Sequence, residues 1–501
     1  MAATRARTHR IIALLAAAVL LAGGACSDDD GDGGGAVPDQ GTTTASTADR
    51  PEGPAADVSE ELEGGNGAFV GSATPSELPD GWVEGERVAA GTATSYRTDG
   101  PYPEDGRIEL TEGASADYRT RVVVRRPDDG DAFNGTVVVE WLNVSGGLDA
   151  GPDYTFAADE LHRGGYAWVG VSAQHLGVEG GPVAVSVRGG EGVAGRGLKG
   201  IDPERYGTLS HPGDAYAYDI FTQVARAIRT GDLLGDLEPE RVLAVGESQS
   251  GFMLATYADG VQPLTHQYDG FLIHSRGAAT APLGEPGTGI DVVSTFVGGS
   301  PTRIRTDLDV PVLVLETESD VLGVINYSRA RQDDTDRFRL WEVAGTAHAD
   351  RTIVGPLADD LDCGVPINDG PQRFVVRTAV RALDRWVAER EAPPEAERLA
   401  VEGGAFRRDA DGIAEGGVRT PPVDVPVAVL SSEQGPTGGV ICLLLGSTKP
   451  LPPDRLAELY PSQDAYLDAY REATDETIEA GFVLEEDRDA MLDAAEPERL
   501  P

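Results

Sequence analysis

The chain has 501 residues, 40% of them hydrophobic, which is enough to bury a large core. Its formal net charge of −43 at pH 7 argues against nucleic acid or an anionic membrane surface as a partner, because like charges repel. A surface this acidic indicates a soluble, exported protein.

The amino terminus is predicted to be a targeting segment and not part of the fold. Three arginines within the first ten residues precede an apolar run over residues 11–22, which is shorter than the roughly 20 residues that a membrane-spanning helix needs. We therefore predict a signal peptide over residues 1–25. It resembles a bacterial lipoprotein signal, which implies that Cys26 is lipidated and anchors the chain to the outer face of the cell membrane. Cleavage after Ala25 into a soluble secreted protein stays an alternative.

Residues 26–78 are predicted to form a disordered tether. The segment contains runs of identical small or acidic residues, such as Asp28–Asp30 and Gly33–Gly35. Few of its side chains are apolar, so it cannot bury enough surface to offset the entropy of ordering. We expect it to act as a flexible spacer between the membrane and a folded domain over residues 79–497.

Short apolar segments alternate with helical patterns through this domain. The helical run Asp214–Arg229 places apolar residues on one face. Strands are predicted over 121–124, 136–141, 166–171, 242–245, 270–273, 312–315 and 338–343. The alternation predicts an α/β fold of the α/β-hydrolase type, with a mainly parallel sheet and helices on both faces.

Three long connections rich in Gly and Pro interrupt the alternation and are predicted to be lids or pocket walls. They cover residues 174–213, 275–308 and 350–372. Beyond Trp386 the chain is less regular, and we expect a C-terminal extension packed on the same domain.

The most informative stretch is Gly246–Gly251, with the sequence Gly-Glu-Ser-Gln-Ser-Gly. It follows a predicted strand and precedes a predicted helix, which is the layout of a nucleophile elbow: a tight turn that presents a Ser hydroxyl at the carboxyl end of a parallel sheet. Ser248 is the predicted nucleophile, and Ser250 is the weaker alternative. The usual pattern has Gly where Ser250 stands, because strand and helix backbones come close there.

A Ser nucleophile needs a His base, and the His needs a carboxylate that orients it. In α/β-hydrolases the chain order is Ser, acid, His, each at a strand end. Asp320 follows the strand 312–315 and is the predicted acid, with Glu318 as its rival. His348 follows the strand 338–343 and is the predicted base.

Two other histidines differ from His348 in their place along the chain. His274 also ends a strand, but that strand directly follows the elbow unit, which is the wrong place for the base. His211 lies in a loop before a helix and is a candidate to line the pocket. The oxyanion of the reaction is expected to contact the backbone N–H of Gln249 and that of Asn143 or Val144, which follow an early strand.

Cys363 and Cys442 remain after the targeting segment, and a disulfide between them is expected in an oxidising compartment, with two buried free thiols as the alternative. No His, Cys and Asp residues show metal-ligand spacing, so neither a metal nor an organic cofactor is expected.

Several motifs together resemble a bacterial α/β-hydrolase domain family whose substrates are poorly assigned. They are Glu140–Gly147, His211–Asp214, Gly246–Gly251, Cys363–Asn368, Gly416–Pro421 and Leu459–Ser462. The resemblance implies one catalytic domain that includes the C-terminal extension, and a family pattern that tolerates Ser at position 250.

These patterns predict a secreted serine hydrolase that forms an acyl-enzyme on Ser248. A carboxylic ester, either a small molecule or lipid-like, is the expected substrate. Peptide hydrolysis and acyl transfer by the same three residues are alternatives. A non-catalytic surface binding protein on a hydrolase scaffold is a further alternative.

Overall fold

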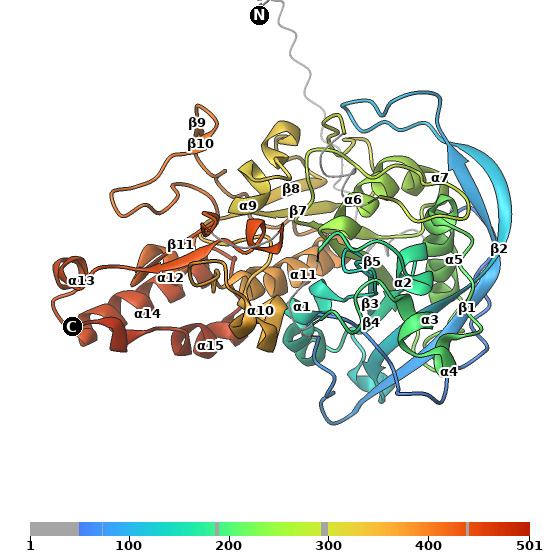
Figure 1. Cartoon of the computed structure of the whole chain (residues 1–501), viewed down its shortest axis with the longest axis horizontal. Helices are drawn as coiled ribbons and strands as arrows, with labels where there is room; N and C mark the ends of the chain where they lie inside the picture. The colour runs from blue at the N-terminus through green and yellow to red at the C-terminus, as the bar shows by residue number, and fades with distance from the viewer. Residues whose placement is uncertain (1–49, 73, 186–189, 292–298, 437–439) are drawn as a thin grey trace, which may run out of the picture. The chain divides into compact units, whose positions relative to one another are not determined.

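An eight-stranded sheet forms the centre of the computed structural model (Figure 1). The structure describes residues 50–501 except 73, 186–189, 292–298 and 437–439. These residues belong to one unit that runs from Thr47 to Pro501. The predicted signal peptide, Cys26 and the first part of the predicted tether lie outside the described residues.

Six strands of the sheet are parallel, and two long antiparallel strands extend it at one edge. The order across the sheet is β1-β2-β4-β3-β5-β6-β7-β8. The antiparallel strands are β1 (Trp82–Arg97) and β2 (Thr111–Pro127). The parallel strands are β3 (Thr136–Trp141), β4 (Ala167–Val171), β5 (Arg241–Glu247), β6 (Gly270–His274), β7 (Val312–Thr317) and β8 (Phe338–Val343). The predicted fold class is confirmed.

Strand β1 was not predicted, and strand β2 is much longer than the predicted run 121–124. Strand β1 lies at the sheet edge, where only part of its residues are buried, so it has no continuous apolar run. The six parallel strands are buried almost throughout because helices cover both faces of the sheet.

Neighbouring strand residues contribute to two separate cores. Val137 packs in one core with α5 (Ala217–Arg229) and α6 (Gln249–Thr256). Val138 points to the opposite face and packs with α1 (Pro152–Arg163) and α11 (Gln372–Glu389). This alternation follows from the two-residue period of a strand.

Short helices lie in the connections between the longer elements, including the first and third of the long connections. In chain order these are α2 (His175–Glu179), α3 (Gly197–Ile201), α4 (Pro203–Tyr206), α7 (Gln262–Thr265), α9 (Glu318–Leu322) and α10 (Arg351–Val354). Short 3-10 segments are η1 (Gly130–Ala132), η2 (Asp214–Tyr216), η4 (Tyr327–Ala330), η5 (Gly355–Asp360), η6 (Val440–Leu443), η7 (Glu485–Asp487) and η8 (Pro497–Arg499), and η3 (Tyr257–Val261) is a π-helical turn.

The described part of the predicted tether packs on the domain, so the prediction of disorder up to residue 78 is wrong for these residues. Ala56, Val58 and Leu62 are buried. Asp57 exchanges two backbone hydrogen bonds of 2.8 and 2.9 Å with Ala90 of strand β1. An edge strand offers unpaired N–H and C=O groups, and the segment satisfies them despite its polar composition.

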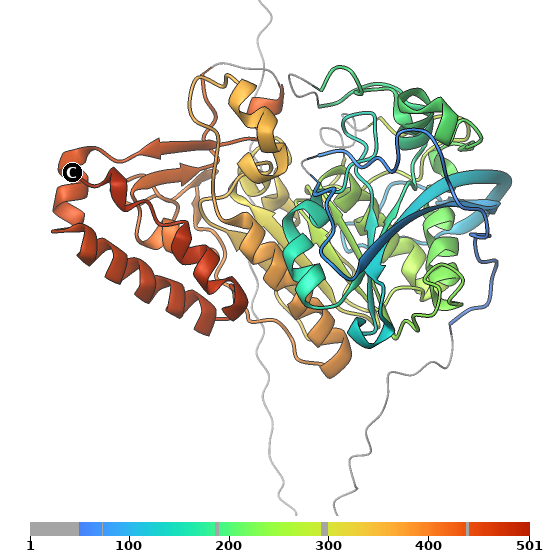
Figure 2. The same ribbon diagram turned by 90° about the horizontal axis from the view of Figure 1, so that it is seen from below.

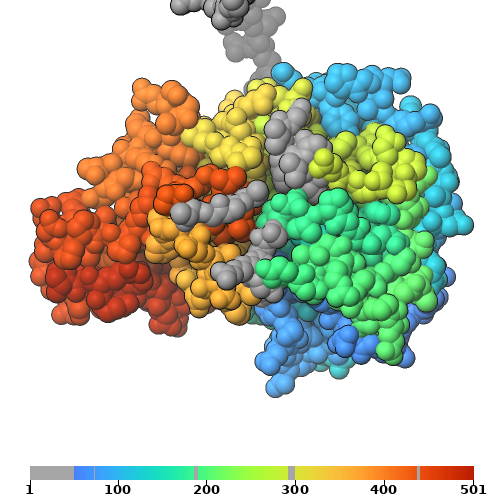
Figure 3. Space-filling view, in the orientation of Figure 1, coloured from blue at the N-terminus to red at the C-terminus, as the bar shows by residue number. Residues whose placement is uncertain are grey.

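The C-terminal extension forms a small core of its own, which packs on helix α11. Its elements are β9 (Val401–Glu402), β10 (Ala405–Phe406), α12 (Pro421–Asp424), β11 (Ala428–Ser431), β12 (Ser447–Pro450), α13 (Pro453–Leu459), α14 (Gln463–Glu479) and α15 (Arg488–Asp493). Tyr466 and Tyr470 of α14 pack with Phe374 of α11. In Figure 2 the red C-terminal helices lie beside the orange α11, and in Figure 3 the orange and red residues occupy one side of the face shown.

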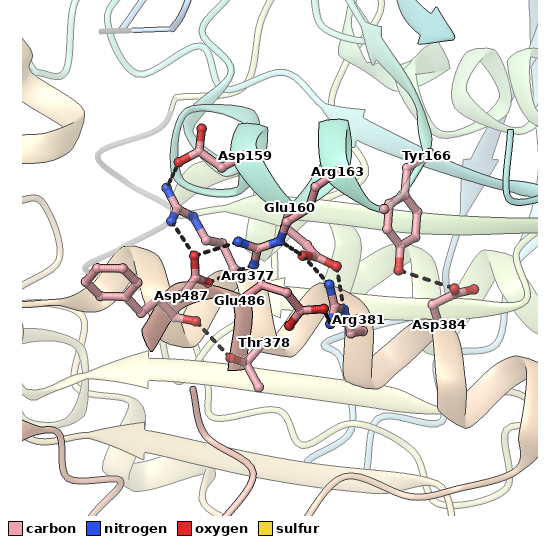
Figure 4. Close-up of polar contacts among 12 residues, drawn as sticks. Asp159, Glu160, Arg163, Tyr166, Arg377, Thr378, Arg381, Asp384, Glu486 and Asp487 are labelled. Atoms are coloured by element: carbon pink, nitrogen blue, oxygen red, sulfur yellow. Dashed lines mark hydrogen bonds and ion pairs between the residues drawn. The ribbon is translucent and has the colours of Figure 1, made fainter. Parts of the chain in front are cut away.

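A cluster of arginines and carboxylates joins this extension to the sheet-covering helices (Figure 4). Asp487 accepts hydrogen bonds from Arg163 of α1, at 2.7 and 2.9 Å, and from Arg377 of α11, at 2.9 Å. Arg381 of α11 bonds Glu160 of α1 at 2.7 and 2.8 Å. Because Asp487 is buried and its partners come from both helices, we treat the extension as part of the domain.

Candidate active site

Ser248 lies at the apex of a tight turn between β5 and α6. Its backbone has φ 58° and ψ −122°, a conformation that non-glycine residues rarely adopt. A Cβ added to Gly251 would lie 2.7 Å from the carbonyl oxygen of His274, so this position excludes larger residues. Ser250 is buried and donates a 2.8 Å hydrogen bond to the carbonyl oxygen of Glu247. The position where two backbone segments come closest is therefore Gly251. Position 250 has room for the side chain of Ser.

The structure brings together the three predicted catalytic side chains. His348 Nε2 lies 2.8 Å from Ser248 Oγ, and His348 Nδ1 lies 2.6 Å from Asp320 Oδ1. With Asp320 ionised, Nδ1 donates to the carboxylate and Nε2 accepts from the hydroxyl. All three residues are buried, with at most 6% of any one exposed.

The second oxygen of Asp320 is held by three donors. Asp320 Oδ2 accepts hydrogen bonds of 2.7 Å from the backbone N–H of Thr317, the hydroxyl of Thr317 and the hydroxyl of Ser275. Asp320 is the third residue of α9, and its bond to Thr317 closes the capping box of that helix. The helix start therefore fixes the carboxylate with its other oxygen toward His348.

The rival residues have other partners. Glu318 accepts from the backbone N–H of Gly345 at 2.7 Å and from Arg408 at 3.1 Å. His274 Nδ1 lies 2.9 Å from a carboxylate oxygen of Asp153. His211 Nε2 lies 2.9 Å from a backbone carbonyl oxygen, that of Ala173. None of these contacts involves Ser248.

The charges around His348 set its proton affinity. Burial alone lowers the pKa of His348, but the carboxylates of Asp320 and Glu247 outweigh burial, so the pKa is raised above its usual value. Burial raises the pKa of Asp320 as well, and His348 and the Thr317 donors outweigh it, so that pKa is lowered. Asp320 therefore stays ionised while the imidazole titrates.

Glu247 is a second carboxyl group beside the imidazole, and sequence reasoning assigned it no chemistry. Its Oε1 lies 3.5 Å from His348 Nε2, on the side of the ring that faces Ser248. Burial raises the pKa of Glu247 to about 7, with His348 acting in the opposite direction. Glu247 lies within the Gly246–Gly251 motif, but that motif gives no sign of the contact with His348, because the contact forms only when the chain folds.

The predicted oxyanion donors have different partners. Gln249 is the first residue of α6, where backbone N–H groups have no partner within the helix. The backbone N–H of Asn143 donates to Ala150 at 2.9 Å, so the prediction that it could hold an oxyanion is wrong. The N–H of Val144 donates to the side-chain oxygen of Gln249 at 3.3 Å, a long bond that a substrate oxygen can replace.

Gln174 supports this arrangement and was missed by sequence reasoning. Its side-chain oxygen accepts from Gln249 Nε2 at 2.7 Å and from Trp141 Nε1 at 3.0 Å. Gln174 begins the first long connection, and no sequence signal sets it apart from other polar loop residues. The contact links that connection to the turn that carries Ser248.

Ser248 and His348 both line a cavity of about 510 Å³. A larger cavity of about 1220 Å³, between the β1–β2 hairpin and residues 279–291 and 299–302, includes neither residue. Among the described residues, no group of three His, Cys, Asp or Glu side chains is placed to hold a metal ion. In the same part of the chain, no helix is both long and apolar enough to cross a membrane.

Cys363 and Cys442 form a disulfide with a Cα–Cα distance of 5.6 Å. Both are buried beside Val354 and Leu445. The bond joins the connection after β8 to turn η6 of the C-terminal extension.

The profile of a family described as alpha/beta hydrolase domain matches residues 52–493 of the chain. No curated protein matches the chain. Solved structures that match the chain include a fungal esterase structure from Rhizomucor miehei, with 12% identity over 63% of this chain and 86% of the other and a TM-score of 0.32. An esterase from Pyrobaculum calidifontis has 14% identity, coverage of 60% and 86%, and a TM-score of 0.29. An α/β serine hydrolase from Xanthomonas campestris has 14% identity, coverage of 59% and 94%, and a TM-score of 0.29.

Proposed function

The chain belongs to the alpha/beta hydrolase domain family, and we propose that it is a serine hydrolase that cleaves carboxylic esters through an acyl-enzyme on Ser248. The observation that carries the proposal is the 2.8 Å contact between Ser248 Oγ and His348 Nε2 beside a cavity that both residues line. A hydroxyl that donates to a neutral imidazole can pass its proton to that ring as it attacks a carbonyl carbon.

In the first step, Ser248 Oγ bonds to the ester carbonyl carbon and His348 Nε2 takes the hydroxyl proton. His348 then gives this proton to the alcohol oxygen as the bond between carbon and alcohol breaks. In the second step, His348 takes a proton from water, and the water oxygen bonds to the acyl carbon. The bond to Ser248 breaks, Oγ regains the proton, and a carboxylic acid leaves.

The negative oxygen that forms in both steps needs hydrogen-bond donors. The N–H groups of Gln249 and Val144 are the proposed donors, and the side-chain oxygen of Gln249 now accepts from Val144. We expect this amide oxygen to give way to the substrate oxygen. Two such donors in a water-poor site stabilise the transition state by several kcal/mol, since one is worth about 3 kcal/mol.

A fluorophosphonate probe, which phosphonylates activated serines, tests the proposal on the full-length protein. We expect mass spectrometry to locate the adduct on Ser248, and the adduct to vanish in Ser248→Ala. The matched control is Ser250→Ala, two residues away in the same turn, which should still be labelled. A folded protein that takes up no probe would instead support a non-catalytic binding protein.

We also propose that the chain is exported and anchored through a lipid on Cys26. The basic and apolar pattern of residues 1–25 supports this proposal, as does a buried disulfide, which persists in oxidising compartments. Full-length protein expressed in a bacterium should fractionate with membranes, and Cys26→Ser should release it. Equal amounts of both proteins in the soluble fraction would contradict the anchor.

A further inference from the structure

The cavity beside Ser248 has apolar walls made by segments far apart in the chain. Two of its walls consist mainly of aliphatic and aromatic side chains. One wall contains Phe69, Val70, Leu148, Ala150, Pro152, Val193 and Ala194, and the other contains Ala349, Ile353, Val354, Pro356, Leu357, Ile441 and Leu444. A volume of about 510 Å³ lies within the range of roughly 300–1,000 Å³ that is usual for small-molecule sites.

The described lining residues include no Lys or Arg. Glu247 and His348 are the ionisable side chains among them, and both belong to the reacting centre. A carboxylate or phosphate on the substrate would therefore find no cation among the lining residues that the structure describes, and the net charge of −43 repels anions from the surface as well. These features disfavour an anionic substrate.

The first wall is anchored to a buried ion pair. The carbonyl oxygen of Phe69 accepts a 2.7 Å hydrogen bond from Arg121, and Arg121 also bonds the carboxylate of Asp149 at 2.8 Å. The N–H of Gly71 donates to the carbonyl oxygen of Asp149 at 2.8 Å. The segment before strand β1 is thus held in place as part of the cavity.

The disulfide between Cys363 and Cys442 stabilises the second wall. Val354 packs with Cys363 and Cys442, and Ile441 and Leu357 pack against the same cluster. The wall residues after His348 and those of turn η6 are therefore linked covalently near the cavity. The hydrogen bonds of Arg121 hold one wall and the disulfide holds the other. We therefore expect the cavity to keep its shape and to select its ligand by that shape.

We propose that this cavity binds an apolar acyl chain, and that the preferred substrates are uncharged esters of medium-chain carboxylic acids. The proposal rests on the function proposed above. The acyl group remains bonded to Ser248 through both steps, whereas the alcohol leaves after the first. Contacts with the acyl chain can therefore lower the barriers of both steps.

The test is hydrolysis of p-nitrophenyl esters by the full-length protein, because this series changes the acyl group and keeps the alcohol constant. We expect kcat/KM to be at least about tenfold higher for the octanoate than for the acetate, since each buried methylene contributes to binding. The p-nitrophenyl monoester of succinic acid should be a poorer substrate than the butyrate, which has an equally long, uncharged chain.

Two residues of one turn give a matched pair of variants. Ile441 lines the cavity, whereas Leu443 is 37% exposed and is absent from the lining. Ile441→Ala should reduce the ratio of octanoate to acetate kcat/KM by about three- to tenfold, and Leu443→Ala should leave it unchanged. Val70→Trp, which fills the cavity from the other wall, should reduce the same ratio even further.

The outcomes separate the two proposals. Labelling at Ser248 together with a preference for the acetate or the succinate monoester would overturn the medium-chain proposal and leave the hydrolase in place. The medium-chain proposal would also be overturned if Ile441→Ala and Leu443→Ala had the same ratio of octanoate to acetate kcat/KM, and if folded Val70→Trp kept the ratio of the unchanged protein. No label and no turnover of any ester by folded protein would overturn both.

Discussion

Around Ser248 a buried carboxylate pairs with an imidazole, whereas at the junction with the C-terminal extension a buried carboxylate pairs with two arginines. Asp320 and Asp487 are both at least 98% buried, and partners lower the pKa of each carboxyl group against the effect of burial. The partners differ: Asp320 contacts His348, and Asp487 contacts Arg163 and Arg377.

The partner determines what such a buried charge can do. A guanidinium stays protonated at every physiological pH, so the cluster around Asp487 keeps its charges and acts as a structural connection. An imidazole gains and loses a proton near neutral pH, and His348 does so beside a hydroxyl and an open cavity. Burial of a carboxylate is therefore common to both regions. The region proposed to be reactive differs in that the partner of its carboxylate can titrate and lines a cavity.

The largest effect should come from removing the charge that orients the imidazole. Asp320→Asn should lower kcat by about ten-thousandfold, because the amide favours the wrong tautomer of His348. Steady-state hydrolysis of a p-nitrophenyl ester measures this loss of kcat, and the free energy of unfolding of the variant shows whether its fold is intact. Glu318→Gln, two residues earlier in α9, is the control and should lower kcat far less. A similar loss in both variants would remove Asp320 from its proposed role.

A smaller effect, on stability, should follow from breaking the arginine cluster. Asp487→Ala leaves two arginines facing each other without their shared carboxylate and should lower the free energy of unfolding by about 3–5 kcal/mol. Its kcat per folded molecule should be unchanged. Asp475→Ala removes an exposed carboxylate that pairs with Arg488 in the same extension, and should lower the free energy of unfolding far less, because solvent screens an exposed ion pair. Urea unfolding of both variants gives the comparison.

The smallest expected effect is a displaced pH profile. His348 works as a base when neutral, and its pKa is raised, so kcat/KM should fall as the pH drops through a value above the usual 6.5 or so. Glu247→Gln removes one carboxylate that favours protonated His348, so the acid limb should move to lower pH. An acid limb that does not move would show that Glu247 has no influence on the base.

The arginine cluster should not respond in this range. Because its pKa is lowered in the folded state, Asp487 contributes stability above its unfolded pKa of about 3.9, and this contribution disappears only as the pH falls through the still lower folded value. The loss of unfolding free energy caused by Asp487→Ala should therefore be the same at pH 6 and pH 8. A loss that differs between these two pH values would contradict a fixed-charge connection.

The fold class could be predicted because apolar strands and amphipathic helices alternate along the chain, and periodicity is a local property. The order of Ser248, Asp320 and His348 could be predicted for the same reason, since each follows a recognisable strand. The edge strand β1 and the packing of residues 50–72 could not, because their partners come from other segments and their own composition is polar.

The sequence by itself determined which residues are candidates for the chemistry and at which strand ends they stand. Tertiary structure decided which of them meet. It placed Asp320 rather than Glu318 beside His348, occupied the N–H of Asn143 with Ala150, and brought Glu247 and Gln174 to the site. These outcomes depend on hydrogen bonds between residues up to about a hundred positions apart, such as His348 and Ser248. Such contacts have no local signature in the sequence, so only the folded chain decides them.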